Sequence, residues 1–242
     1  MSARSGPVAR GASSAPRMGR PPSADREAIV RAAVEVGFAR LTMSAVGKRV
    51  GVSHSTLYSY FRGRGELAAA AVDHAVNGID WPLPEGGWRA YLTSTAWAHW
   101  ELYSAHPGLA KEITALRITA PALVRRDNRT GLALLDLGFA PDDAMLVVDM
   151  LAELVTQAFL GSVPEGDATA EPAEEGGTFL EAAQRRRREL TEPWMDLYDE
   201  RLRGVLVEAV SGPPSIWFER KLTLFLDGVA ARRGHRADAT GD

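Results

Sequence analysis

The chain has 242 residues, of which 45% are hydrophobic, and a formal net charge of −3. This length suits one small and one larger globular domain, each with a full core. The absence of cysteine excludes a disulfide framework and thiolate chemistry and fits a reducing, cytoplasmic location. We find no signal-peptide pattern and no run of the roughly 18 apolar residues that a membrane span needs. We therefore expect a soluble protein with no membrane partner.

Charge is distributed unevenly along the chain. Residues 1–65 carry eleven basic and three acidic side chains, whereas the remainder carries 17 basic and 28 acidic ones. A cationic N-terminal unit on an anionic body favours contact with a polyanion through that unit. A solvated basic tail would explain the first few arginines equally well.

The N-terminal part is predicted to begin with a flexible arm and a short helix. Residues 1–22 are rich in Arg, Ser and Pro without hydrophobic periodicity, which indicates a flexible basic arm. Ser23 can cap a first helix, with acidic residues in its first turn and an apolar face, and Gly37 is expected to end it.

A helix-turn-helix is predicted directly afterwards. Thr42 can cap a second short helix that Gly51 ends, and Ser53 can cap a third helix that runs toward Phe61. Gly51 supplies the permissive backbone of the turn. The apolar spacing expected to lock the two helices together is provided by Val46, Val50, Val52 and Leu57.

The rest of the chain shows helical periods and no run of period two, so we predict an all-α fold. A fourth helix is expected over 65–77, and the turn-rich segment that follows divides a DNA-binding domain (23–78) from a larger C-terminal domain (79–233). Residues 164–177 are acidic and predicted to be mobile. The remaining predicted helices are 88–105, 107–116, 120–137, 141–160, 179–210 with a break near Pro193, and 215–233, followed by a tail (234–242).

The third helix presents side chains suited to reading DNA. They are small or hydrogen-bonding and almost uncharged, whereas a solvent face would normally carry Lys or Glu. Thr42 can donate to phosphate, and Arg62 and Arg64 place cations just after the helix. The alternative is that the two tyrosines pack in the domain and the hydroxyls only cap helix ends. The predicted reading residues are Ser53, His54, Ser55, Thr56, Tyr58, Ser59 and Tyr60.

These motifs resemble the N-terminal signature of the tetracycline-repressor (TetR) family, over about residues 19–70. The matching motifs are Leu41-Thr42, Gly51-Val52-Ser53, Thr56-Leu57-Tyr58, Tyr60-Phe61 and Leu67. The resemblance implies a dimer whose two recognition helices read the half-sites of a palindrome. It also implies that Arg20, in Gly19-Arg20-Pro21, enters the minor groove. The segment between Glu35 and Thr42 is about one helical turn shorter than is usual in the family, so we expect a short first helix.

Two predicted helices, 141–160 and 215–233, are apolar enough to pack on more than one side. In the resembling family the corresponding helices pair with their copies in a four-helix dimer interface, and two-fold reading of DNA favours such a homodimer. The alternative is that both helices belong to an ordinary monomer core.

A ligand cavity is predicted in the C-terminal domain. One helix is crowded with aromatic side chains, a density typical of either a core or a pocket wall. Polar residues on neighbouring helices could give such an apolar cavity directional hydrogen bonds. The candidate ligand-binding residues are Thr95, Trp97, His99, Trp100, Tyr103, Thr114, Arg117, Asn128, Glu153 and Gln157.

The C-terminal half also resembles the tetracycline-repressor subfamily, in which a histidine binds drug-bound magnesium. Here Ile113 stands at that position, and His99 and Thr95 replace the phenylalanine and asparagine of the drug site, while Arg117 keeps an arginine. We therefore expect an effector other than magnesium-tetracycline, no cofactor and no metal, since the histidines form no cluster in the sequence.

Together these patterns predict a DNA-binding transcriptional regulator whose effector shifts the fourth helix and releases a palindromic operator. Repression rather than activation is implied by the family. One alternative is a ligand-independent architectural DNA-binding dimer. Another is an enzyme with an appended DNA-binding domain, for which we find no convincing catalytic spacing, so we expect no enzymatic activity. The run Arg185–Arg188 is predicted to be a solvated helical face.

Overall fold

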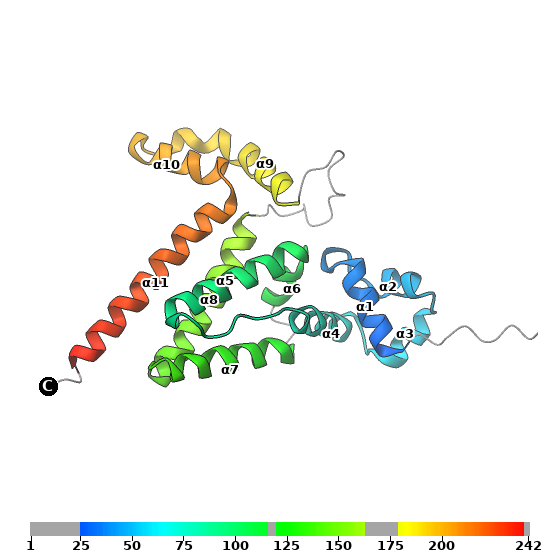
Figure 1. Ribbon diagram of the computed structural model, residues 1–242. Coiled ribbons are helices and arrows are strands. Elements are labelled where there is room, and N and C mark those ends of the chain that lie inside the picture. Colours follow the sequence, from blue (N-terminus) through cyan, green and yellow to red (C-terminus); the bar gives the residue numbers. More distant parts are fainter. Residues whose placement is uncertain (1–24, 116–119, 163–178, 240–242) are drawn as a thin grey trace, which may run out of the picture.

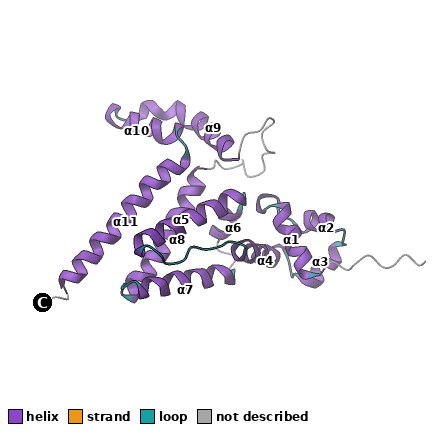
Figure 2. Cartoon of the chain, in the orientation of Figure 1, coloured by secondary structure: helices purple, strands orange, loops and turns teal. Residues whose placement is uncertain are grey.

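The computed structural model describes residues 25–115, 120–162 and 179–239. These ranges are helical, with connecting turns and no strand, which confirms the predicted all-α class (Figure 2). The predicted arm (1–22), Ser23, Arg117 and the acidic segment 164–177 lie outside the described residues, and so does the proposed minor-groove contact of Arg20.

The N-terminal domain contains the predicted helices. Helix α1 (Arg26–Val36) is followed by the 3-10 helix η1 (Phe38–Arg40), α2 (Met43–Val50), α3 (His54–Tyr60) and α4 (Arg64–Asn77). The prediction that Ser23 caps α1 was wrong. The helix begins two residues later than that cap requires, and the Asp25 carboxylate accepts the amide of Ala28 at 2.7 Å. An acidic cap also suits the positive end of the helix dipole.

Helix α1 is short, as expected, because Gly37 ends it with a positive φ of 84°. The next three residues turn into η1, which directs Phe38 into the core.

The C-terminal part of the chain is built around a bundle of four helices. These are α5 (Gly87–Ala105), α6 (Leu109–Thr114), α7 (Pro121–Asp136) and α8 (Pro141–Ser162). In Figure 1, α11 (Pro214–Ala239) runs diagonally beside this bundle, and the segment of α9 (Phe179–Thr191) and α10 (Glu200–Ser211) lies above it. Helix α11 extends beyond the predicted end at residue 233 into the predicted tail. The 3-10 helix η3 (Glu192–Leu197) lies between α9 and α10 in the chain.

The run Arg185–Arg188 on α9 is partly engaged rather than wholly solvated. Arg187 donates to the carbonyl of Ala209 at 3.4 Å, and Arg188 donates to that of Ser211 at 3.2 Å. Cations at the last carbonyls of a helix stabilise its C-terminus. These two arginines therefore join α9 to the end of α10.

Among the described residues, α8 alone is long and apolar enough to cross a membrane by length and composition. Its inner stripe, including Leu151, Val155 and Phe159, is buried against α5, α7 and α11. This stripe is part of the core of the C-terminal domain.

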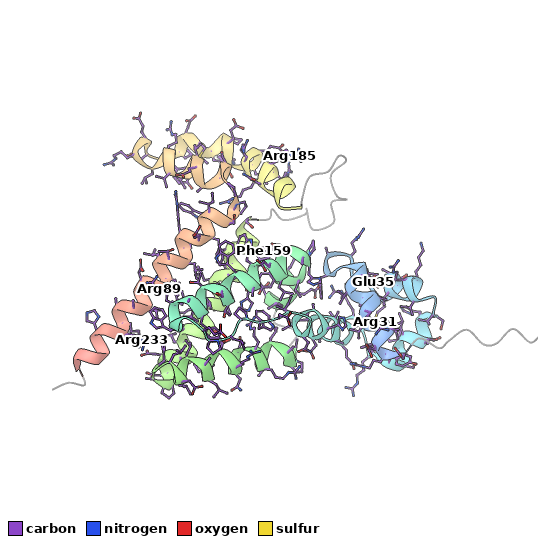
Figure 3. All side chains as sticks on the ribbon, in the orientation of Figure 1. Arg31, Glu35, Arg89, Phe159, Arg185 and Arg233 are labelled. Carbon is purple, nitrogen blue, oxygen red and sulfur yellow. The ribbon has the colours of Figure 1, made fainter. Side chains whose placement is uncertain are left out.

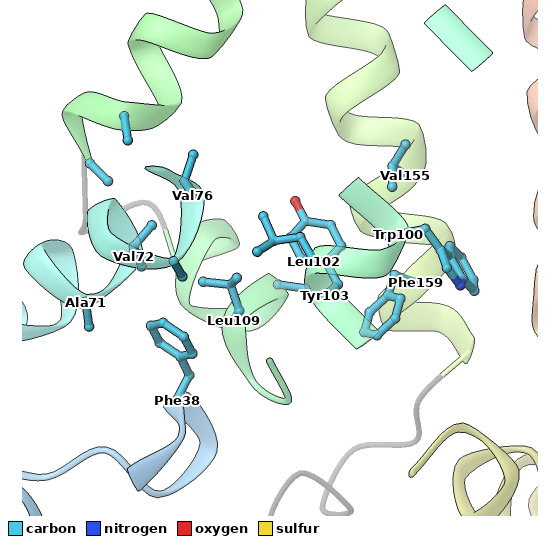
Figure 4. Close-up of a cluster of buried hydrophobic side chains, with 14 of the residues drawn as sticks. Phe38, Ala71, Val72, Val76, Trp100, Leu102, Tyr103, Leu109, Val155 and Phe159 are labelled. Carbon is cyan, nitrogen blue, oxygen red and sulfur yellow. The ribbon is translucent and has the colours of Figure 1, made fainter. Parts of the chain in front are cut away.

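The N-terminal helices meet the C-terminal bundle where η1 contacts α6. Figure 4 shows the Phe38 ring between Ala71 and Val72 of α4 and Leu109 of α6. The amide of Ala39 donates to the carbonyl of Pro107 at 3.3 Å. The core therefore continues from the N-terminal helices into the C-terminal bundle.

Candidate functional site

The turn between α2 and α3 has the geometry that the sequence predicts. Thr42 accepts the amide of Ala45 at 3.0 Å, and Ser53 accepts that of Thr56 at 3.2 Å, so both predicted caps are confirmed. Gly51 adopts the left-handed conformation with φ 74°. These groups satisfy the free backbone donors at the start of each helix.

Gly47, which sequence reasoning did not single out, decides how closely the two helices approach. A Cβ atom at this position would lie 3.1 Å from Leu57 Cδ1 and 3.2 Å from the carbonyl oxygen of Val52. Leu57 is fully buried. The residue at position 47 therefore has to be small for α3 to be seated on α2.

Helix α3 presents most of its predicted reading face to solvent. Leu57 points inward, whereas Tyr58 is 48% exposed and its ring meets that of His54 edge-on, with centroids 4.8 Å apart. Tyr60 differs from the other predicted reading residues, because it is half-buried and packs against the core. The residues left exposed are Ser53, His54, Ser55, Tyr58 and Ser59.

The hydroxyl groups near the start of α3 are already connected to one another. Ser53 Oγ lies 2.8 Å from both Ser55 Oγ and Thr56 Oγ1, and Ser59 donates to the carbonyl of Thr56 at 2.6 Å. Thr56 is half-buried. These bonds fix the rotamers of the exposed end of α3.

The two arginines after α3 have different surroundings. Arg62 is exposed, and its guanidinium forms no ion pair with any residue in the described ranges. Arg64 pairs with Glu112 of α6 and donates to the carbonyl of Leu41 at 2.9 Å. The pKa of Arg64 is raised by its hydrogen bond to Glu112. Arg64 therefore joins the N-terminal helices to α6, and its phosphate contact stays a prediction.

A cavity of about 490 Å³ lies between α5, α6, α7 and α8. Four of the predicted ligand-binding residues line it together, and its wall also includes apolar Ile113 and Leu123. Tyr103 donates to Thr156 Oγ1 at 2.9 Å, because the Thr156 hydroxyl itself donates to the carbonyl of Ala152. Burial raises the pKa of Tyr103. The four predicted residues are Tyr103, Thr114, Glu153 and Gln157.

A second, smaller cavity of about 240 Å³ lies between the α4 to α5 connection, α5 and α7. Thr95 is the predicted ligand-binding residue that lines it, and Trp81 and Tyr91 supply aromatic walls. Arg126, which sequence reasoning missed, borders both cavities.

His99 and Arg126 meet in the interior between these cavities. His99 Nδ1 lies 2.9 Å from the carbonyl of Thr95, so Nδ1 carries the proton, and Nε2 accepts from the Arg126 guanidinium. Burial and the positive charge of Arg126 hold the pKa of His99 well below its usual value. The imidazole is thus a neutral acceptor that orients the arginine.

Besides His99, three further predicted ligand-binding residues line neither cavity. Trp100 stacks on Phe218 of α11 with centroids 4.6 Å apart, and Trp97 meets the same ring edge-on at 5.1 Å. Their side of α5 faces α8 and α11, so both rings belong to the core. Asn128 is exposed, because it lies on the outer side of α7. The expectation that these three side chains share a cavity with the others is therefore corrected.

No group of three or more His, Asp or Glu side chains that could hold a metal ion occurs within the described ranges. The histidine nearest the cavities, His99, uses both ring nitrogens in hydrogen bonds.

The helices predicted to dimerise carry exposed apolar side chains on their outer faces. Met145, Leu146 and Met150 of α8 are exposed, and Leu224 of α11 is 75% exposed. A second exposed apolar group, which sequence reasoning missed, occupies η3 and α10 and comprises Trp194, Leu197, Tyr198, Leu202, Val205 and Val207. Exposed apolar area of this extent is typical of protein interfaces.

Comparisons with known proteins agree with this geometry. The family described as bacterial regulatory proteins of the tetR family matches residues 26–71, which cover α1 to α3 and the first part of α4. The chain is 27% identical over 234 residues to the HTH-type transcriptional repressor DrrR1 of Streptomyces coeruleorubidus, covering 92% of this chain and 84% of that protein.

Two solved structures from Streptomyces coelicolor share the fold. One, from strain A3(2), is described as a possible TetR family transcriptional regulator and is 23% identical, with a TM-score of 0.66; the match covers 86% of this chain and 99% of that one. The other is the TetR family protein ActR in complex with actinorhodin, which is 22% identical with a TM-score of 0.63, over 88% of this chain and 97% of that one.

Proposed function

We propose that this chain is a regulator of the TetR family, whose model matches residues 26–71. As such it would be a cytoplasmic repressor that releases its DNA when a small effector binds. The observation that carries the proposal is the exposed polar face of α3, held rigidly on α2 by Gly47 and Leu57. A short helix seated in this way can enter the major groove and meet base edges. The relative DrrR1 is itself a transcriptional repressor.

The operator contacts follow from the charges and hydrogen-bonding groups on this face. His54, Ser55, Tyr58 and Ser59 would meet base edges and the sugar-phosphate backbone, and Arg62 would neutralise a phosphate. A homodimer formed through α8 and α11 would present two such helices to a palindrome in double-stranded DNA.

The effector site we propose is the cavity between α5, α6, α7 and α8. Its volume of about 490 Å³ lies within the range of roughly 300–1,000 Å³ common for small-molecule pockets. The lining combines apolar and hydrogen-bonding side chains with charged ones, which suits an aromatic molecule that carries several polar groups. The charged residues are Arg126, Asp127, Asp149 and Glu153. The related structure of ActR is a complex with actinorhodin, which supports a small-molecule effector here.

Helix α4 provides a physical route from this cavity to α3. Asp73 of α4 accepts the amide of Ala122 at 2.6 Å and so caps α7, and Arg64 at the start of α4 pairs with Glu112 of α6. Both α6 and α7 line the cavity. An effector that prefers another arrangement of these helices would move α4 and change the spacing of the two recognition helices.

Selection of genomic DNA fragments by the purified protein tests the DNA-binding part. We expect a palindromic site, and we expect Tyr58→Ala to weaken binding to it by about 1–3 kcal/mol, the usual value of a base contact. Leu83→Ala, which truncates an exposed side chain in the α4 to α5 connection, is the matched control. Recovery of non-palindromic DNA, or equal affinities of the two variants, would contradict the proposal.

The sensor part is tested separately with a small-molecule screen. A molecule that binds the folded protein raises its unfolding temperature, and the same molecule should weaken operator binding. A variant with Gln157→Leu keeps the size of a cavity-lining side chain but removes its hydrogen bonds, and it should respond less. Binding that leaves operator affinity unchanged would contradict the sensor role.

A further inference from the structure

The smaller cavity, of about 240 Å³, has a wall chemistry distinct from that of the proposed effector site. Three arginines of α7, Arg125, Arg126 and Arg129, line it, and the described part of its lining includes no aspartate or glutamate. Arg126 pairs with Asp127. Arg125 and Arg129 are exposed and form no ion pair with any residue that the structure describes. The cavity therefore has an excess of positive charge.

A buried hydroxyl group without a partner lies in the same wall. Thr95 is 3% exposed, and its Oγ1 atom forms no hydrogen bond with any residue that the structure describes. Buried polar atoms are almost always satisfied, because leaving one unpaired costs about 1–3 kcal/mol. The hydroxyl can donate to an oxygen atom of a bound molecule, which is the partner that the protein itself does not supply.

Aromatic rings complete the cavity. Trp81 is fixed by donation from its Nε1 to the carbonyl of Val76 at 3.0 Å, and its ring lies against that of His99 with centroids 4.7 Å apart. The Arg126 guanidinium lies 5.5 Å from the Trp81 ring centroid. Tyr91, which is buried, lines the same space. Such walls favour a flat ring, and a cavity of about 150 Å³ already accepts benzene.

We infer that this cavity is a second ligand site, which binds an aromatic carboxylate with its ring against Trp81 and Tyr91 and its carboxylate among Arg125, Arg126, Arg129 and the Thr95 hydroxyl. Arginines recognise carboxylates through paired, charge-assisted hydrogen bonds. The site also borders the last turn of α4 through Val76 and Asn77. An occupant would therefore contact the helix that joins the two domains.

Isothermal titration of the full-length protein with 2-naphthoate and its uncharged analogue 2-naphthamide tests the inference. We expect saturable binding of the carboxylate, at least about tenfold tighter than that of the amide, and weakened by added salt. Equal affinities, or no saturable binding of the carboxylate, would overturn the inference. The titration requires no DNA, so its outcome does not depend on the proposed repressor function.

Matched variants locate the binding. Removing the two exposed charges with Arg125→Gln and Arg129→Gln should weaken 2-naphthoate by about tenfold or more, and Thr95→Val should weaken it by a few-fold. Arg185→Gln removes the same charge from α9 (Figure 3), and the described lining of the cavity includes no residue of that helix. An unchanged affinity in the double variant, or an equal loss in Arg185→Gln, would overturn the assignment. Circular dichroism establishes that each variant is folded. The single variants Arg125→Gln and Arg129→Gln measure the contribution of each arginine to the affinity for 2-naphthoate.

Discussion

At the level of single residues, His99 illustrates how burial sets the chemistry of a side chain. It is 3% exposed, donates to Thr95 and accepts from Arg126. Its protonated form would lose the hydrogen bond from Arg126 and place two positive charges side by side. The protein therefore holds this imidazole neutral.

We predict that acid destabilises the protein partly through His99. The unfolded chain protonates this histidine near its usual pKa, whereas burial and Arg126 hold the pKa of the folded state well below it. Between these values the unfolded state binds more protons, so the free energy of unfolding falls as the pH drops below about 6.5. The slope for one such group approaches about 1.4 kcal/mol per pH unit.

Urea unfolding between about pH 7.5 and pH 5 measures this dependence. His99→Gln should reduce the slope. His106→Gln should reduce it less, because His106 is only half-buried and its pKa is lowered less strongly, by burial and by His74. An unaltered slope in the His99→Gln variant would refute the prediction.

A second prediction concerns the close approach of α2 and α3. Gly47→Ala would place a Cβ atom 3.1 Å from Leu57 and 3.2 Å from the Val52 carbonyl. Overpacking costs about 1–3 kcal/mol, which the better helix propensity of alanine, up to about 1 kcal/mol, offsets only in part. We expect a net loss of about 1 kcal/mol in thermal or urea unfolding.

Gly65→Ala is the matched control for this variant. Gly65 lies in α4, and a Cβ atom there would meet nothing within 4 Å. We expect its stability to be unchanged or slightly raised. Equal stability of the two variants would show that Gly47 is not needed for packing.

At the level of elements, the junction between η1 and the turn before α6 depends on Gly108. This residue has φ 89°, and a Cβ atom on it would lie 2.5 Å from the Ala39 amide nitrogen. Because the Ala39 nitrogen belongs to the backbone, no side-chain rotation can relieve this clash. Phe38, seated beside Leu109 (Figure 4), fixes η1 in this position.

We predict that Gly108→Ala destabilises the protein by the strain of positive φ, about 1–2 kcal/mol, together with an overpacking cost of about 1–3 kcal/mol. Gly87→Ala is the control, because Gly87 has φ 85° but no neighbour within 4 Å. Urea unfolding measures the loss of stability in both variants. The difference between the two losses gives the cost of the contact with Ala39, because the strain of positive φ is common to both. A difference near zero would mean that η1 moves away from Gly108 without cost.

At the level of the whole molecule, an α8 and α11 interface would cover the apolar side chains that the single chain exposes. These are Met145, Leu146 and Met150 on α8 and Leu224 on α11. Interfaces of permanent dimers are rich in such side chains. Pairing through this face would also fix the distance between the two recognition helices.

We predict that Leu224→Arg converts the dimer to a monomer and weakens operator binding steeply. A charge at this position would be buried without a partner against the second copy. Sedimentation velocity over a range of concentrations measures the mass. Leu83→Arg adds the same charge to the α4 to α5 connection and should leave the mass unchanged. A dimeric Leu224→Arg protein would exclude α11 from the interface.

Helix caps, turn glycines and apolar periods in the sequence determined the fold class and the positions of the N-terminal helices. The caps Thr42 and Ser53, the left-handed Gly51 and the apolar periods placed α2 and α3 and the class of the fold. These features depend on backbone donors and side chains only a few residues apart, so their physics can be read along the chain.

Only the tertiary structure decided which side chains share a cavity. The sequence grouped Trp97, Trp100 and Asn128 with the ligand site. In the folded chain Trp97 and Trp100 pack against Phe218 of α11, and Asn128 faces solvent. Arg64 pairs with Glu112, 48 residues away in the chain, and Arg126 donates to His99, 27 residues away. Helical period fixes which residues share a face, whereas the neighbour that covers the face depends on packing between distant segments.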